Sequence, residues 1–302
     1  CRFLAPRALF LWAVAPLALS AAPRPFTVAP KIADQQNLLE PDQVRLTGFL
    51  GRRIMANEKN RLLVVDEDRL LVSYRNRPGV HQWDGEHVGK WLHAATLAWV
   101  NTGDAALRAK LDRVAAGLLQ TQGADGYLGT YLPEKRWSSW DVWAHKYNLI
   151  GLLTYHRYTG DPAAMAACVR IADLLARTFG EQPGQLNLVL SGSHAGMAAS
   201  SVLEPMVWMY RLTGEARYLE FCQMVLRRWD GPRGPRLISD LAAGRGVHQV
   251  GNAKAYEMMS CLNGALELYR VTGDGQILKA IRHAWEDILA QRLYITGTCS
   301  QH

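Results

Sequence analysis

Apolar residues recur at the spacing i, i+3, i+4 through most of the chain between residues 88 and 292, as in "LLTYHRY" and "LELYRV". This spacing puts the apolar side chains on one stripe of an α-helix, and that stripe is normally buried against a neighbour. The same region contains no convincing run in which apolar and polar residues alternate, which is the pattern of a half-buried strand. The pattern therefore predicts an all-α fold.

Four of the apolar stretches run into nearly the same short motif, which reads "NTGD", "YTGD", "LTGE" and "VTGD". Glycine just past the end of a helix supplies the left-handed conformation that closes the last turn. The acidic residue that follows can cap a new helix, by hydrogen bonds for aspartate and mainly by charge for glutamate. Each motif is therefore a helix stop followed by a helix start. The four pairs are Gly103–Asp104, Gly160–Asp161, Gly214–Glu215 and Gly273–Asp274.

The four glycines lie 57, 54 and 59 residues apart, so each repeat holds two helices and a longer return loop. Stacked helical hairpins of this kind form either an open solenoid or a closed toroid. The corners are short, whereas the opposite connections cover residues 75–88, 122–143, 180–195, 230–252 and 292 onward. Because long loops in compact domains are usually functional, the end that carries them is the predicted functional face.

Histidine, aromatic and acidic side chains gather in these long connections, and six of the nine histidines lie in them or just inside the helices that they feed. A sugar ring stacks its apolar face on an aromatic side chain, while polar side chains hold its hydroxyls. A single residue of this kind more often packs on the core, so the prediction of a carbohydrate-binding face rests on the set. Its members are His81, His87, His145, His194, His248, His302, Trp83, Trp137, Trp140, Trp143, Tyr127, Tyr131, Asp84, Glu86, Asp125, Glu134 and Asp141.

The opening segment has the pattern of a secretory signal peptide. Two arginines precede an apolar run of about a dozen residues that is too short to span a membrane, and small residues follow at positions 20–22. The predicted organisation is a signal peptide over residues 1–22, clipped at its start because the chain begins with Cys1, an exported linker over 23–40, and a helical domain over 41–302. We expect a secreted or periplasmic protein with no membrane attachment once the signal is removed.

Charge and cysteine usage exclude several classes of partner. The net charge of +7 does not predict a nucleic-acid partner, because the basic residues are spread along helices instead of gathered in a run. The five cysteines stand far apart without a CxxC spacing, and Cys168, Cys222 and Cys261 are expected to be buried free thiols. The sequence also lacks HExxH, phosphate-loop and dinucleotide motifs, so no metal or nucleotide site is predicted within the chain.

One combination of motifs resembles a known family. In the same order, these motifs resemble the N-terminal part of glycoside hydrolase family 127, the β-L-arabinofuranosidase-like family: "WDGEHVGKWLHAATLAWVNTGD", "LQTQGADGYLGTYLP", "YLEFCQMVLRRWD" and "AWEDILAQRLYITG". The resemblance covers about residues 40–302. It implies an (α/α)6 toroid of six helical hairpins followed by β-sandwich domains, and it places an earlier hairpin at residues 41–75.

The resemblance also implies retaining hydrolysis of a glycosidic bond. In the family a cysteine is the nucleophile, cysteines and a glutamate hold zinc, and a second glutamate is the acid/base, all after the "YITG" segment. This chain ends at His302, shortly after that segment. We therefore expect the catalytic residues and the zinc ligands of the full-length enzyme to lie beyond His302. We also expect the toroid to be incomplete at its C-terminus and the 302-residue piece to be an inactive, poorly soluble fragment.

Part of a sugar-binding wall can be carried over from the family by matching motifs. "GEHVGKW" resembles the family's GHxxGHY, which places His87 at the first histidine and Lys90 at the second. "HKYNLIG" and "GNAKAYE" place asparagine where the family has histidine, and "SGSHAGMAA" keeps a loop histidine. These replacements would change the contacts to sugar hydroxyls, because an amide or an ammonium bonds differently from an imidazole. The predicted substrate-binding residues are Trp83, Glu86, His87, Trp140, His145, Asn148, His194 and Asn252.

Two other functions fit the same architecture. One is a different sugar enzyme on an (α/α)6 toroid, such as an unsaturated glucuronyl hydrolase or an epimerase, which would use Asp84, Glu86 and Asp141 for acid/base work. The other is a noncatalytic carbohydrate-binding toroid. The toroid alone does not choose among them, because one fold hosts many functions.

Overall fold

The computed structural model describes residues 22–299, so nearly all of the predicted signal peptide lies outside the described residues. Within this range there is no strand, and only two isolated bridges occur, between Phe179 and Leu186 and between Leu293 and Cys299. The prediction of an all-α fold is confirmed. No helix of the described range is both long and apolar enough to cross a bilayer.

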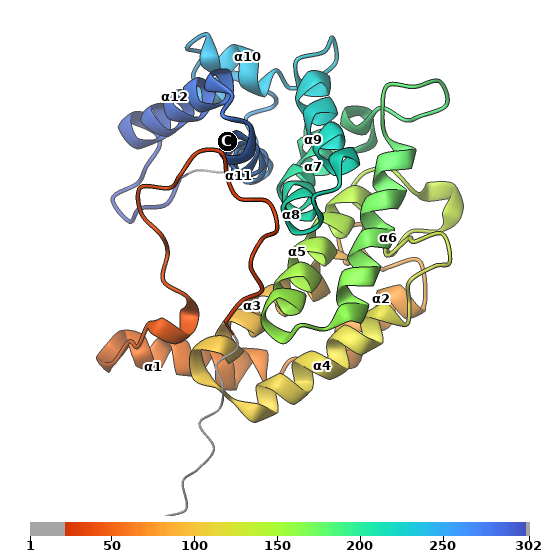
Figure 1. Ribbon diagram of the computed structural model, residues 1–302, viewed down its shortest axis with the longest axis vertical. Coiled ribbons are helices and arrows are strands. Elements are labelled where there is room, and N and C mark those ends of the chain that lie inside the picture. The colour runs from red at the N-terminus through yellow and green to blue at the C-terminus, as the bar shows by residue number, and fades with distance from the viewer. Residues whose placement is uncertain (1–21, 300–302) are drawn as a thin grey trace, which may run out of the picture.

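The four corners of the sequence join four helical hairpins. Their first helices are α3 (Glu86–Thr102), α5 (Asp141–Thr159), α8 (Leu203–Thr213) and α11 (Ala255–Thr272). Their second helices are α4 (Ala105–Leu119), α6 (Pro162–Thr178), α9 (Ala216–Trp229) and α12 (Gly275–Gln291). Successive first helices pack on one another, and α4, α6 and α9 pack in the same order outside them. The hairpins therefore form two concentric layers of a curved array (Figure 1).

Shorter elements complete the array. An N-terminal pair, α1 (Gly48–Asn57) and α2 (Glu67–Arg75), precedes the first full hairpin, as the family resemblance implied, and a π-helical turn over Glu58–Leu62 joins the two. The long loops contain α7 (Met197–Ser200), α10 (Leu237–Ala242) and 3-10 turns at Pro133–Lys135, Leu188–Ser191 and Val247–Gln249; another 3-10 turn precedes α1 at Pro41–Gln43.

The corners form as their sequence predicts. Gly103, Gly160, Gly214 and Gly273 are left-handed, with φ between 72° and 77°. The side chains of Asp104, Asp161 and Asp274 accept hydrogen bonds from amides in the first turn of the next helix, whereas Glu215 makes no such bond. The threonine before each glycine adds a contact that the sequence analysis missed. Its hydroxyl donates to the carbonyl four residues earlier and accepts from the amide of the acidic residue, as in Thr159, which bonds Tyr155 and Asp161.

Two glycines let α3 and α5 approach closely. A Cβ atom on Gly89 would lie 2.2 Å from the carbonyl oxygen of Tyr147, and one on Gly151 would lie 2.5 Å from the carbonyl oxygen of Gly89. Only hydrogen fits at these positions. The contact seats α3 against α5, and α5 is buried on nearly every side as a result.

Residues 24–34, within the segment predicted as a linker, lie across the corners, and we call them the N-terminal strap. The amides of Arg24, Val28 and Ile32 donate to carbonyls three residues before the corner glycines of α5, α8 and α11. Those carbonyls have no partner within their own helices, so the strap satisfies them. From residue 26 to residue 32 the even positions are half-buried and the odd ones exposed, which shows that one edge of the strap faces the helices.

The array is open on one side. Figure 1 shows α1 and α12 on the two sides of an opening that the N-terminal segment crosses. Large apolar side chains are exposed on both helices, with Phe49 and Leu50 66% and 58% exposed on α1, and Trp285 and Leu289 59% and 46% exposed on α12. Surfaces of this kind normally pack against other protein.

Candidate functional site

The inner helices α3, α5, α8 and α11 begin at the face with the long loops and end at the tight corners. Each has an acidic residue in its first turn, namely Glu86, Asp141, Glu204 and Glu257. The partial positive charge at a helix N-terminus stabilises a carboxylate placed there. The predicted functional face thus carries four carboxylates at four helix ends.

Unusual backbone conformations are concentrated on the same face. Among the described residues, six that are not glycine have a positive φ, between 54° and 62°, and all six lie in the long connections. Such conformations cost of order 1 kcal/mol or more each, and they cluster where the surroundings enforce a functional geometry. The six are Trp137, Ser139, His194, Ala195, Arg236 and Ala253.

Aromatic rings connect two of the inner helices, α5 and α11, across this face. Trp143 packs edge-on against Trp140, Tyr147 and Tyr256, with ring centroids 5.2–5.4 Å apart. The hydroxyls of Tyr147 and Tyr256 lie 2.6 Å apart and so link α5 to α11. His194 lies beside Trp140, with ring centroids 5.4 Å apart. We call the connected set the aromatic cluster, and it comprises Glu86, Lys90, Trp140, Trp143, Tyr147, His194, Asn252 and Tyr256.

Lys90 lies at the centre of the aromatic cluster. Its Nζ is 2.8 Å from Oε1 of Glu86 and lies over the rings of Tyr147 and Tyr256, at 4.5 and 5.2 Å from their centroids. The other oxygen of Glu86 accepts a hydrogen bond from the indole of Trp143. Lys90 is therefore held by a carboxylate and by aromatic faces, which attract a cation. These contacts fix the position of Lys90 on the predicted functional face.

Beneath Lys90 lies a second lysine that the sequence analysis did not single out. Lys146 is 2% exposed, and its Nζ lies 4.4 Å from the centroid of Trp143. Burial lowers the pKa of Lys146 to about 8, and the nearby carboxylate of Glu204 opposes this shift. Burial also raises the pKa of Glu204, while Lys146 lowers it. The pair places an ammonium and a carboxyl group in a poorly solvated layer under the aromatic cluster.

The structure joins four of the eight predicted substrate-binding residues in the aromatic cluster. Glu86 and Trp140 belong to it as described, and the amide nitrogen of Asn252 lies 3.1 Å from Nδ1 of His194. His87 is exposed at the start of α3, with its Nδ1 3.9 Å from Oε1 of Glu86. Trp83 is 45% exposed and stacks on His81 in the neighbouring loop.

The remaining two predicted residues lie below the surface. His145 has no exposed area, its Nδ1 bonds the carbonyl of Asp141, and its Nε2 accepts from the amide of Leu128. Asn148 is also fully buried, and its amide nitrogen donates to Tyr74 and to the carbonyl of Leu128. In this structure both residues lie beneath the long loops and support them, and neither side chain is exposed on the predicted functional face. Burial lowers the pKa of His145, in agreement with a structural role.

The three acids proposed for a different toroid enzyme differ in exposure and in hydrogen bonding. Asp141 has no exposed area, and its oxygens accept hydrogen bonds from the hydroxyl of Tyr127 and the amide of Trp137, so it cannot reach a substrate. Asp84 fixes its own loop by accepting from Ser73 and from the amide of His81. Of the three acids, Glu86 is the one in the aromatic cluster.

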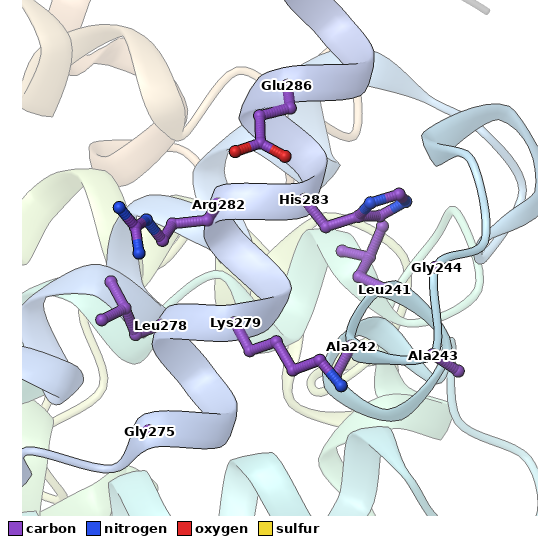
Figure 2. A pocket seen from close by; sticks show the side chains of 10 residues that line it. All are labelled: Leu241, Ala242, Ala243, Gly244, Gly275, Leu278, Lys279, Arg282, His283 and Glu286. Atoms are coloured by element: carbon purple, nitrogen blue, oxygen red, sulfur yellow. The ribbon is translucent and has the colours of Figure 1, made fainter.

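Another hollow opens away from this face. A space of about 590 Å³ opens between the end of α10 and the outer side of α12 (Figure 2). Lys279 and His283 point toward α10, and His283 bonds the carbonyl of Arg245. No aromatic platform lines this hollow. It does not have the chemistry of the predicted face.

Comparison with known proteins decides the family. The model of the β-L-arabinofuranosidase GH127 catalytic domain matches residues 43–302. The chain belongs to the GH127 family. It is 23% identical over 243 residues to a non-reducing end β-L-arabinofuranosidase of Bifidobacterium longum subsp. longum, a match that covers 70% of this chain and 36% of that protein.

Solved structures of GH127 proteins share the fold. A GH127 β-L-arabinofuranosidase from Geobacillus stearothermophilus T6 superposes with a TM-score of 0.62 at 19% identity, over 82% of this chain and 44% of that one. A second GH127 β-arabinofuranosidase gives a TM-score of 0.64 at 19% identity, over 94% and 46%. The toroid prediction is confirmed as the GH127 helical fold. The chain spans less than half of each of these relatives.

The family resemblance implies a zinc ion, but the described residues do not form a zinc site. Cys168, Cys222 and Cys261 are buried free thiols, as predicted, and burial raises the pKa of each. A zinc-binding thiol must be deprotonated, and these environments favour the neutral form. Within residues 22–299, no three histidine, cysteine or acidic side chains come together as a metal site.

The sequence did not point to some residues at the predicted functional face. They are Lys146, Tyr147, Glu204 and Tyr256. They lie inside helical patterns, where an aromatic residue is normally assigned to the core and a charged residue to a solvated face. A usable signal was the acidic residue in the first turn of each inner helix, because all these first turns meet at one face.

Proposed function

We propose that this chain forms the sugar-binding wall of an exported glycoside hydrolase that acts on β-L-arabinofuranosides or closely related sugars. The match of residues 43–302 to the GH127 catalytic domain carries the proposal. The GH127 relatives named above are arabinofuranosidases, which makes a furanoside the first substrate to test.

The aromatic cluster supports a sugar ligand. Trp140 and Tyr256 offer apolar ring faces, while Glu86, His194 and Asn252 offer carboxylate, imidazole and amide groups for hydroxyls. Lys90 adds a fixed ammonium donor where the family pattern has histidine. We propose that these residues bind and orient the sugar, and that Lys90 makes the hydroxyl preference of this protein differ from that of its arabinofuranosidase relatives.

The catalytic residues belong to the same proposal. By family resemblance, a cysteine nucleophile, a glutamate acid/base and a zinc ion act in the full-length enzyme and are supplied from outside the described residues. When bound, zinc would keep a cysteine ligand deprotonated and nucleophilic. The role of the described residues is to bind and orient the sugar and to exclude water from it. We further propose that the enzyme is secreted or periplasmic, from the N-terminal signal pattern.

The test uses the full-length protein with 4-nitrophenyl β-L-arabinofuranoside and the matching α-L-arabinofuranoside and β-D-galactopyranoside. We expect hydrolysis of the β-L-furanoside with retention of configuration, seen by proton NMR, and about one zinc per chain. His194→Ala should lower kcat/KM at least tenfold, whereas His283→Ala, in the hollow between α10 and α12, should leave it unchanged. Sugar binding without hydrolysis of any glycoside would replace the proposal with a noncatalytic carbohydrate-binding toroid.

A further inference from the structure

The buried lysine under the aromatic cluster is held by aromatic rings. The Nζ of Lys146 lies 4.4 Å from the ring centroid of Trp143 and 4.7 Å from that of Tyr147. Its ammonium makes no hydrogen bond to any residue that the structure describes. A cation is attracted to the face of an aromatic ring, and the attraction is stronger where water is excluded. The ammonium of Lys146 therefore fixes both rings from below.

Trp143 and Tyr147 connect the rest of the aromatic cluster. Trp143 packs edge-on against Trp140 and Tyr256, and its indole donates a hydrogen bond to Glu86. The hydroxyl of Tyr147 lies 2.6 Å from that of Tyr256. A movement of either ring would therefore displace the side chains that are proposed to contact the sugar.

The charged and titratable groups around Lys146 come from three other inner helices. Glu204 on α8 and Glu257 on α11 favour the protonated lysine, whereas Lys90 on α3 opposes it. Glu257 is 1% exposed, and its Oε2 makes no hydrogen bond within the described residues. Burial raises the pKa of the Cys261 thiol on α11, so this group stays neutral. Burial of Lys146 outweighs the carboxylates and lowers its pKa to about 8, so the ammonium loses its proton at mildly alkaline pH.

Loss of this proton should change the aromatic cluster and the stability of the fold in opposite directions. A neutral amine is not attracted to ring faces as a cation is, so Trp143 and Tyr147 lose the contact that fixes them. The same loss removes the cost of burying a charge, so the folded protein becomes more stable. A residue with a structural role alone would change sugar binding and stability in the same direction.

We propose that Lys146 is a positioning residue for the sugar site: its ammonium fixes Trp143 and Tyr147, and loss of the proton loosens the aromatic cluster and weakens sugar binding. The proposal rests on the proposed function, because it takes the aromatic cluster to bind the sugar. It gives the protein a pH response that originates in the inner helices and is separate from the ionisation of the catalytic residues.

The first measurement follows the indole N–H signal of Trp143 by NMR, in full-length protein labelled at the tryptophan nitrogens, from pH 6.5 to 9.5. Trp143→Phe identifies the signal. We expect it to shift with a midpoint near pH 8 and expect the shift to vanish in Lys146→Met. Glu204→Gln removes a carboxylate that favours the ammonium, so it should lower the midpoint by at least half a pH unit. Glu220→Gln, at an exposed position on α9, is the control and should keep the parent midpoint.

The second measurement is the affinity of the same protein for L-arabinose by calorimetry, with urea denaturation in the same buffers. We expect the dissociation constant to rise at least threefold from pH 7 to pH 9 while the free energy of unfolding also rises. Lys146→Met should bind with the weak affinity of the alkaline parent at both pH values. A dissociation constant that does not change, or an affinity and a stability that fall together, overturns the proposal.

The two measurements separate this proposal from the proposed function. If L-arabinose does not bind at any pH, the proposed function fails, and the indole signal alone decides whether Lys146 fixes the aromatic cluster. A shift that persists in Lys146→Met overturns that role. If Lys146→Met does not fold, the midpoint in Glu204→Gln decides, and a midpoint equal to that of Glu220→Gln overturns the proposal.

Discussion

The amide of Val28 donates a 2.8 Å hydrogen bond to the carbonyl of Arg211, at the C-terminal end of an inner helix. Arg24 and Ile32 make the same contact at the two neighbouring inner helices. Between these bonds the ring of Phe26 lies against the guanidinium groups of Arg157 and Arg211, 4.5 and 3.9 Å from its centroid. The N-terminal strap therefore connects three hairpins at their corners.

The first prediction concerns the strap. Phe26→Ala removes two cation–π contacts and should lower the free energy of unfolding by about 1–2 kcal/mol. Phe49→Ala is the control, because Phe49 is 66% exposed, and it should change stability by less than about 0.5 kcal/mol. Urea denaturation of both variants measures the difference. Equal effects would mean that the strap does not stabilise the corners.

The second prediction concerns the exposed apolar side chains on α1 and α12, which affect how stability can be measured. We expect the 302-residue chain on its own to aggregate, because Leu50 and Trp285 project from α1 and α12. Leu50→Lys with Trp285→Lys should increase the monomeric fraction severalfold in size-exclusion chromatography, whereas Val64→Lys, at another exposed apolar site, should not. The double variant then provides the background for the stability tests.

A third prediction concerns the contact of α3 with α5. Gly89→Ala forces a methyl group to within 2.2 Å of the carbonyl oxygen of Tyr147, and the helices must separate. We expect a loss of about 2–3 kcal/mol, which exceeds the gain in helix propensity of up to about 1 kcal/mol. Gly275→Ala, at a helical glycine with no atom within 4 Å of the added methyl, should be neutral or slightly stabilising.

The corners offer a matched pair of capping residues. The carboxylate of Asp161 accepts from the amides of Ala163 and Ala164, at 2.7 and 3.4 Å, while Glu215 makes no capping bond. Asp161→Ala should therefore cost about 1 kcal/mol and Glu215→Ala less than half as much. Thermal unfolding monitored by circular dichroism distinguishes them. A larger loss for Glu215→Ala would contradict the capping model.

The last prediction is a pH dependence from Lys146. Its pKa is about 8 in the folded protein against an ordinary lysine value of 10.5, so between these values the unfolded chain binds more protons and stability rises with pH, by up to about 3 kcal/mol. Below pH 8 the lysine is protonated in both states and the cost of burying the ammonium is complete. Glu204→Gln removes a carboxylate that raises this pKa, so the rise in stability should begin at lower pH.

Chemical denaturation of the Glu204→Gln variant at half-unit steps from pH 6.5 to 9.5 measures this shift. Glu220→Gln, at an exposed position on α9, is the control and should follow the parent curve. If the pH profile of Glu204→Gln coincides with that of the parent, the Glu204 carboxylate does not affect the pKa of Lys146.

More of the fold than of the site could be predicted from the sequence. Helix ends depend on local chemistry, so the four corners follow from a glycine and an acidic residue alone. The strap could not be predicted in this way, because residues such as Val28 and Ile32 contact backbone carbonyls, which every sequence has. For the same reason the segment resembled a linker.

The site was predicted as a face but not residue by residue. Long loops predicted one end of the array as the functional face, and Glu86, Trp140, His194 and Asn252 come together at that end. His145 and Asn148 were assigned to the wall from their motif, but whether a side chain lies on or below a surface depends on packing from other helices. Lys146 and Glu204 were missed because their significance comes from burial, which a helical pattern does not reveal.

The strap also has a consequence for the order in which the protein assembles. Its residues leave the ribosome before those of the hairpins, but Asp34 pairs with Arg270, which is 236 residues away. At about 5–20 residues per second, the strap waits on the order of 10 to 50 s for that partner. The hairpins can form one by one from local contacts, whereas the strap can engage all three corners only after the last of them is synthesised. Its docking therefore marks the completion of this array during synthesis.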